Sequence, residues 1–210
     1  LSADGEPFIF HDDTGLRVAG VKARMDSLKW KDICELRVFG KYRIPHLQDL
    51  LNEHVRYPQL PLVLDFHQES LVLAETVARY LSPLPSKNIE VLDFYSRRGL
   101  LYRVREIDAK IPVAVMPGPP WNIAACAQEL NPIDIFLGWD SPLTKFLYML
   151  STKLYNVRRE VRKVQERGIP ISGGVANTEA DIRYFLELGM KGIWTDDILT
   201  AKQVLSNPHP

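Results

Sequence analysis

The sequence predicts an α/β protein in which β-strands alternate with helices around a parallel sheet. Two observations lead to this prediction. Short apolar runs recur along the 210 residues, and amphipathic segments lie between them. The length suits one domain, because α/β barrels of more than ~200 residues form single units. We therefore expect residues 1–210 to form one α/β domain.

The predicted strands are short apolar runs of the kind that a sheet buries on both faces. They are too many for one layer of a small sandwich, which favours the alternating arrangement. In chain order they are Phe8–Phe10, Leu62–Phe66, Ile89–Phe94, Ile111–Met116, Ile133–Gly138, Ile169–Gly173 and Gly192–Thr195.

Apolar residues at helical spacing predict helices between these strands. The clearest are Leu71–Leu81, Leu100–Ile107 and Glu179–Leu188, the last of which should end at Gly189. The longest helix is expected from about Leu143 to Glu166. Late in this helix lies a basic cluster, for which a solvated face is the favoured interpretation and a phosphate or lipid patch the alternative. The cluster consists of Arg158, Arg159, Arg162 and Lys163.

Composition limits the classes of partner. The chain has 26 basic and 26 acidic residues, so no overall charge favours nucleic acid or an anionic membrane. No apolar run has the length of a membrane span. Cys34 and Cys126 are expected to be small buried hydrophobes rather than a disulfide. We expect a soluble protein, with the cytoplasm slightly favoured and the oligomeric state open.

Polar residues follow most of the predicted strands. In a parallel α/β fold the residues after each strand share one rim, which is where active sites lie. The loop Met116–Trp121, with three prolines, should also lie on this rim. The rim residues are His11, Asp12, Asp13, Asp65, His67, Asp93, Tyr95, Trp139, Asp140, Gly173, Gly174, Asn177, Asp196 and Asp197.

Three of these residues have specific chemical interpretations. Strand alternation places Asp65 and His67 on one side of the chain, an arrangement that suits a divalent cation or a hydrogen-bonded pair that closes the top of the fold. His11 is either a rim histidine that hydrogen-bonds its aspartate neighbours or a general acid, because imidazole exchanges its proton near neutral pH. Both pairs of alternatives stay open on spacing alone.

Four segments, in the correct order along the chain, resemble the glycerophosphodiester phosphodiesterase family. "LSADGEPFIFHDDTG" is similar to the family pattern T-x-D-G-x-x-V-V-x-H-D, and "IPHLQDLL" resembles its I-P-x-L-x-x-x-L helix start. "LVLDFHQE" aligns with the strand that carries Glu-x-Lys, and "ADIRYFLELGMKGIWTDD" resembles the closing G-x-x-G-I-x-T-D segment. The resemblance covers essentially the whole chain.

The resemblance implies a (β/α)₈ TIM barrel of the phospholipase C-like phosphodiesterase type. It implies hydrolysis of a glycerophosphodiester, or a related lipid-derived phosphodiester, with a divalent cation, Ca²⁺ or Mg²⁺. His11 matches a catalytic histidine that protonates the leaving alcohol. Asp65 stands at the position of a metal-binding Glu, and His67 at that of a Lys. His67, Trp139 and Asn177 are further candidates to contact the substrate, its phosphate or the metal. Trp121 and Trp139, on or near the rim loops, are candidates to contact the alcohol portion of the substrate, with a cap on the barrel core as the favoured interpretation of each.

The sequence also departs from the family pattern. Gly174 stands where the family often has Trp. The family's first strand, with His-Arg-Gly, and its Glu-x-Asp pair would precede Leu1, so we expect an N-terminally incomplete barrel. Two alternatives follow: a catalytically impaired barrel retained for binding, and a phospholipase D-like enzyme of the same fold.

Overall fold

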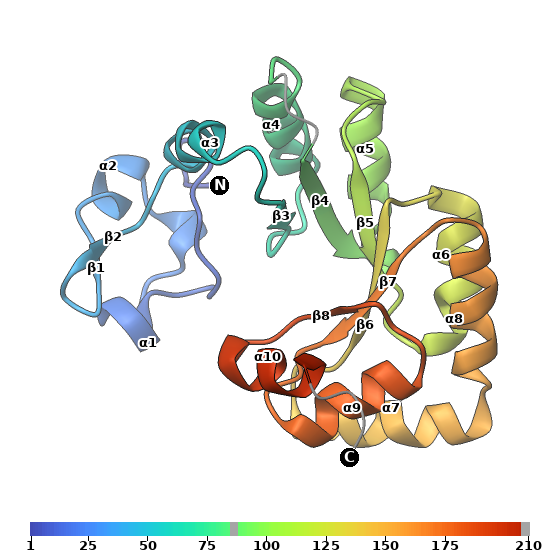
Figure 1. Ribbon diagram of the computed structural model, residues 1–210. Coiled ribbons are helices and arrows are strands. Elements are labelled where there is room, and N and C mark those ends of the chain that lie inside the picture. Colours follow the sequence, from blue (N-terminus) through green and yellow to red (C-terminus); the bar gives the residue numbers. More distant parts are fainter. Residues whose placement is uncertain (85–87, 207–210) are drawn as a thin grey trace. The chain divides into compact units, whose positions relative to one another are not determined.

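The computed structural model describes residues 1–84 and 88–206 (Figure 1). Within them the chain forms two compact units. The first comprises residues 1–91 and 99–111, and the second comprises residues 92–98 and those from 112 onward. The strand β4 (Ile89–Phe94) begins in the first unit and ends in the second. Its bounds are those predicted from the sequence.

The first unit begins with short elements around a small apolar core. The prediction of a strand at Phe8–Phe10 is wrong, because Phe8 makes only an isolated antiparallel bridge with His46. Phe8 and Phe10 instead pack against the buried cluster of Met25, Ile33 and Ile44, so loops and short helices cover these side chains. The short elements are α1 (Leu16–Ala19), η1 (Met25–Ser27), α2 (Trp30–Ile33), β1 (Arg37–Val38) and β2 (Tyr42–Arg43).

The rest of the first unit follows the predicted alternation. Its elements are α3 (Leu47–Arg56), β3 (Leu62–Asp65), α4 (Leu71–Leu81), the start of β4, and α5 (Gly99–Ile107). The helix α4 has the predicted bounds, because the Ser70 side chain accepts a hydrogen bond from the Leu73 backbone N–H and caps it. Helices α4 and α5 pack together, and Arg103 pairs with Glu75 across them at 2.8 Å.

The second unit contains a parallel sheet in chain order. Strand β6 pairs with β5 and β7, and β7 also pairs with β8. The four strands predicted in this unit are confirmed, and each is shorter than expected. Their bounds are β5 (Val113–Met116), β6 (Asp134–Gly138), β7 (Ile171–Gly174) and β8 (Gly192–Ile193). The helical elements are η2 (Tyr95–Arg97), η3 (Pro120–Asn122), α6 (Ile123–Leu130), α7 (Pro142–Leu154), α8 (Val157–Glu166), α9 (Glu179–Glu187) and α10 (Ile198–Ser206).

The single helix predicted from Leu143 to Glu166 is wrong, because the structure has two helices there (Figure 1). Tyr155 has an extended backbone, with φ −126° and ψ 129°, and it ends α7. Asn156 then caps α8 by accepting a hydrogen bond from the Arg159 backbone N–H. The apolar periodicity continues across the break and therefore predicts one helix. The cap at Asn156 shows that a second helix begins there.

None of the helices in residues 1–84 and 88–206 is both long enough and apolar enough to cross a bilayer.

Candidate functional site

His11 lies in the first unit, within a chain of charged contacts. Its Nδ1 atom is 2.9 Å from Asp12 Oδ1. Arg17 donates two hydrogen bonds to the same carboxylate, from Nε to Oδ2 at 2.7 Å and from its terminal nitrogen to Oδ1 at 2.9 Å. The Arg17 guanidinium, and then His11, hold the pKa of Asp12 well below its ordinary range. Asp12 is therefore ionised at neutral pH beside the imidazole.

His67 brings a second imidazole and carboxylate to the same place. The ring centroids of His11 and His67 are 4.3 Å apart, with 49° between the planes. His67 Nε2 lies 3.2 Å from Asp65 Oδ2, at the end of β3. Asp65 and His67 thus share one side of the chain, as strand alternation predicts. The structure brings together three of the predicted site residues, His11, Asp65 and His67, into two facing carboxylate–imidazole pairs.

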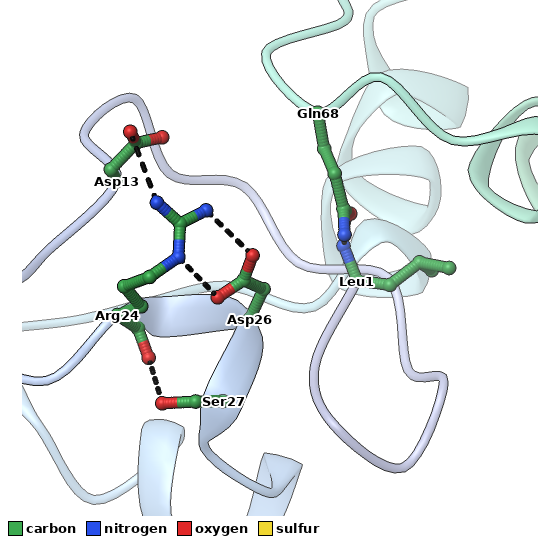
Figure 2. A network of polar contacts seen from close by, with 6 residues as sticks. All are labelled: Leu1, Asp13, Arg24, Asp26, Ser27 and Gln68. Carbon is green, nitrogen blue, oxygen red and sulfur yellow. Dashed lines mark hydrogen bonds and ion pairs between the residues drawn. The ribbon is translucent and has the colours of Figure 1, made fainter.

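The loop that follows His11 is fixed by Arg24 (Figure 2). Arg24 donates to Asp26 at 3.1 and 2.7 Å, and it reaches Asp13 at 3.4 Å. A bridge between Thr14 and Arg24 adds a backbone contact to the same loop. These contacts join residues on both sides of the loop, and sequence reasoning missed them. Arg17 was missed as well, because it lies five residues from Asp12, outside the usual helical pair spacing.

The two predicted site residues of the second unit are engaged in packing and loop contacts. The Trp139 ring stacks on Phe185 at 4.5 Å and 24°, and Lys145 Nζ lies 5.4 Å from the Trp139 ring centroid. Trp139 therefore forms part of an aromatic cluster after β6. Its predicted contact with a substrate stays a prediction.

Asn177 joins the loops that follow β7 and β8. Its side-chain N–H donates to Asp196 Oδ2 at 2.9 Å. Its carbonyl oxygen accepts from the Asp196 backbone N–H at 2.8 Å and from the Thr195 hydroxyl at 3.1 Å. Both the N–H and the carbonyl oxygen of the Asn177 side chain therefore have hydrogen-bond partners within the protein. The predicted contact of Asn177 with substrate stays a prediction.

A buried ion pair at the end of β4 went unrecognised in the sequence. Asp93 is fully buried and pairs with Arg97, four residues further on. The Arg97 guanidinium also lies over the Phe94 ring, 5.6 Å from its centroid. The available signal was the i, i+4 spacing of an acid and an arginine beside a predicted strand end.

The donor set for a divalent cation is incomplete. Asp65 and His67 supply one carboxylate and one imidazole, and these groups contact each other. In the part of the chain that the structure describes, no group of three or more His, Cys, Asp or Glu side chains could hold a metal ion. Ca²⁺ and Mg²⁺ need six or more oxygen-type ligands, several of them from protein or substrate. These residues alone do not fit the ion implied by the resemblance.

Solved structures identify the class of fold. The chain aligns with a glycerophosphodiester phosphodiesterase from Parabacteroides distasonis with TM-score 0.74 and 14% identity, over 99% of this chain and 81% of that one. An Oleispira antarctica phosphodiesterase in complex with the product sn-glycerol-3-phosphate aligns with TM-score 0.76 and 14% identity, over 98% and 82%. A glycerophosphodiester phosphodiesterase from Agrobacterium tumefaciens aligns with TM-score 0.72 and 16% identity, over 98% of this chain and 83% of that one. The fold is the α/β TIM-barrel type that these proteins share.

The family follows from the sequence match. The model of the glycerophosphoryl diester phosphodiesterase family matches residues 1–200. The chain therefore belongs to this family, whose members are phosphoric diester hydrolases. A comparison with curated protein sequences finds no match.

Proposed function

We propose that the protein hydrolyses glycerophosphodiesters and that His11 donates the proton to the departing alcohol. The observation that carries this proposal is the geometry of His11, which contacts an anchored aspartate through Nδ1 and faces a second imidazole. Family membership supports the reaction class. The product in the Oleispira antarctica structure, sn-glycerol-3-phosphate, supports a substrate with a glycerol arm.

Asp12 sets the orientation and tautomer of His11. A carboxylate that accepts a hydrogen bond from Nδ1–H leaves Nε2 to exchange a proton with the substrate. Because Arg17 keeps Asp12 ionised, this acceptor stays in place while the imidazole gains and loses its proton. The imidazolium is the form of His11 able to act as an acid.

The proposed reaction adds water across one phosphorus–oxygen bond. Water forms the new bond to phosphorus, the bond to the alcohol oxygen breaks, and that oxygen takes the proton from His11. The proton lost by the attacking water restores His11 for the next cycle. His67, when protonated, places positive charge beside the phosphate, and the contact of its Nε2 atom with Asp65 orients the ring. No step passes through a metal ion, because the described donor set is incomplete.

The test compares two adjacent aspartates, of which one contacts His11. His11→Ala should lower the turnover of a glycerophosphodiester by ~10²–10⁴-fold, the usual contribution of a general acid. Asp12→Asn should lower it by ~10–100-fold, because it removes an orienting group. Asp13→Asn is the matched control, since Asp13 bonds to Arg24 and its loss should leave the rate close to wild type. Turnover by His11→Ala at the wild-type rate would refute the assignment.

A binding function is the second candidate, and the incomplete donor set for a cation favours it. Such a protein would bind a glycerophosphodiester without releasing glycerol phosphate or the free alcohol. Release of product by the wild type, abolished in His11→Ala, excludes this alternative. A choline-bearing phospholipid as substrate in the same assay tests the phospholipase D-like alternative.

A further inference from the structure

Helix α7 carries an exposed apolar stripe in the second unit. Its members are between 44% and 84% exposed, although four of them are leucines. They recur at intervals of one, three and four residues, which places them on one side of the helix about 100° wide. The opposite side carries Tyr148, which is buried. The stripe consists of Leu143, Phe146, Leu147, Leu150 and Leu154.

An exposed tryptophan lies next to this helix. The short element η3 packs against α7, and its Trp121 is 57% exposed. Trp121 ends the proline-rich loop Met116–Trp121, whose side chains have no role in the proposed reaction. Tryptophan is the side chain most typical of the boundary between bilayer and water, because its ring is large and apolar but carries a polar N–H.

The charges around the stripe are basic. Residues 142–155 include Lys145 and Lys153 and no acid, and Lys145 pairs with Asp181 at 2.6 Å. The exposed arginines Arg158, Arg159 and Arg162 follow in α8, close in sequence to the end of the stripe. Neither Lys153 nor any of these arginines forms an ion pair with a residue that the structure describes. An exposed apolar face that is followed along the chain by exposed arginines is complementary to an anionic lipid surface.

We propose that α7, with Trp121 and the basic start of α8, docks the second unit on the surface of an anionic lipid bilayer. The helix has 13 residues, too few to span a bilayer, so it would lie in the plane of the interface. A second copy of this chain is a poorer occupant. Five side chains are far fewer than the ~20–30 residues per side of a stable interface, and the basic edges of two copies would repel each other. This proposal does not rest on the proposed hydrolysis.

The test is co-sedimentation of the protein with vesicles of phosphatidylcholine alone or of phosphatidylcholine mixed with phosphatidylserine. The wild type should sediment with the mixed vesicles, less so as salt rises, and weakly with phosphatidylcholine alone. Phe146→Glu should weaken binding by about tenfold or more, because it removes a large apolar group from the interface. Arg158→Gln and Arg162→Gln should each weaken it by about fivefold. Leu199→Glu, on α10, is the matched control: Leu199 is 74% exposed and should be dispensable.

Each further outcome decides the proposal. Failure of the wild type to sediment with the anionic vesicles would overturn it, as would equal binding by Phe146→Glu in a variant that melts like the wild type. If Leu199→Glu weakens vesicle binding as much as Phe146→Glu does, the assignment of the docking surface to α7 is overturned. A dimer in size-exclusion chromatography that Phe146→Glu converts to a monomer would assign the stripe to a second copy instead. Hydrolysis of a water-soluble glycerophosphodiester, measured on the same variants, should be unchanged and separates this proposal from the catalytic one.

Discussion

Asp134, the first residue of β6, should make the stability of the protein depend on pH. Its Oδ1 atom accepts a hydrogen bond from the Ile135 backbone N–H at 2.7 Å, and its Oδ2 atom accepts one from the Ser172 hydroxyl at 3.2 Å. Burial outweighs both bonds and raises the pKa of Asp134 to about 6. The folded state therefore binds this proton more tightly than the unfolded chain does.

The sign and size of the effect follow from this difference. Above pH ~6 the folded protein carries a partly buried anion and is destabilised, and the penalty fades as pH falls from ~6 to ~4. The pKa values of Asp134 in the folded and unfolded states differ by about two, which corresponds to ~3 kcal/mol in the free energy of unfolding. Because the side chain is only partly buried, solvent screening reduces this to ~1–2 kcal/mol. Asp134→Asn should remove the penalty and raise the melting temperature near neutral pH by ~2–6 °C.

Thermal unfolding of wild type and Asp134→Asn at about pH 7.5 and about pH 4.5 measures the effect. The gain at the higher pH should largely disappear at the lower one. Asp140→Asn is the control, because Asp140 follows the same strand but is exposed. An equal gain at both pH values, or no gain at either, would refute the reasoning. Asp134 begins a parallel strand, away from the carboxyl end where polar site residues gather, so turnover should be unaffected.

Two further predictions concern residues that were expected at the site. If Asp65 is a metal ligand, calorimetry should detect Ca²⁺ or Mg²⁺ binding with millimolar or better affinity in the wild type and its loss in Asp65→Ala; an absence of binding in the wild type would contradict a metal role. Asn177→Ala removes three hydrogen bonds to Thr195 and Asp196 and should lower the free energy of unfolding, measured by denaturant titration, by ~1–3 kcal/mol. A stable variant with a raised KM would instead support the predicted contact with substrate.

Regular elements were predictable where one local signal sets them. The strand Ile89–Phe94 and the helix Leu71–Leu81 have the predicted bounds, because periodicity and, for the helix, the Ser70 cap agree. The expectation for Phe8–Phe10 was wrong because an apolar run shows that residues are buried, but not which partner buries them. The turn between β1 and β2 depends on Phe39 and Gly40, whose positive φ values of 52° and 69° no apolar pattern reveals.

The candidate site was predictable as a set of residues, but not as a set of contacts. Strand alternation correctly placed Asp65 beside His67, since the two residues are only two positions apart in the sequence. The contact between His11 and His67 joins positions 56 apart in the sequence and depends on tertiary folding. The two hydrogen bonds from Arg17 to the Asp12 carboxylate depend on how the chain turns after His11. Of the two aspartates beside His11, only the structure singles out Asp12 as its partner.

The departure at Gly174 has a physical explanation in the second unit. A Cβ atom at this position would lie 2.5 Å from Trp194 Cβ and 2.8 Å from the Trp194 carbonyl oxygen, so no larger residue fits without movement of Trp194, which follows β8. Trp194 packs edge-on against Phe136 of β6, with ring centroids 4.3 Å apart. The family resemblance places a tryptophan after the preceding strand instead. These close contacts come from the Cβ and the backbone of residue 194 and not from the Trp194 ring, so the path of the chain just after β8 is what requires glycine at position 174.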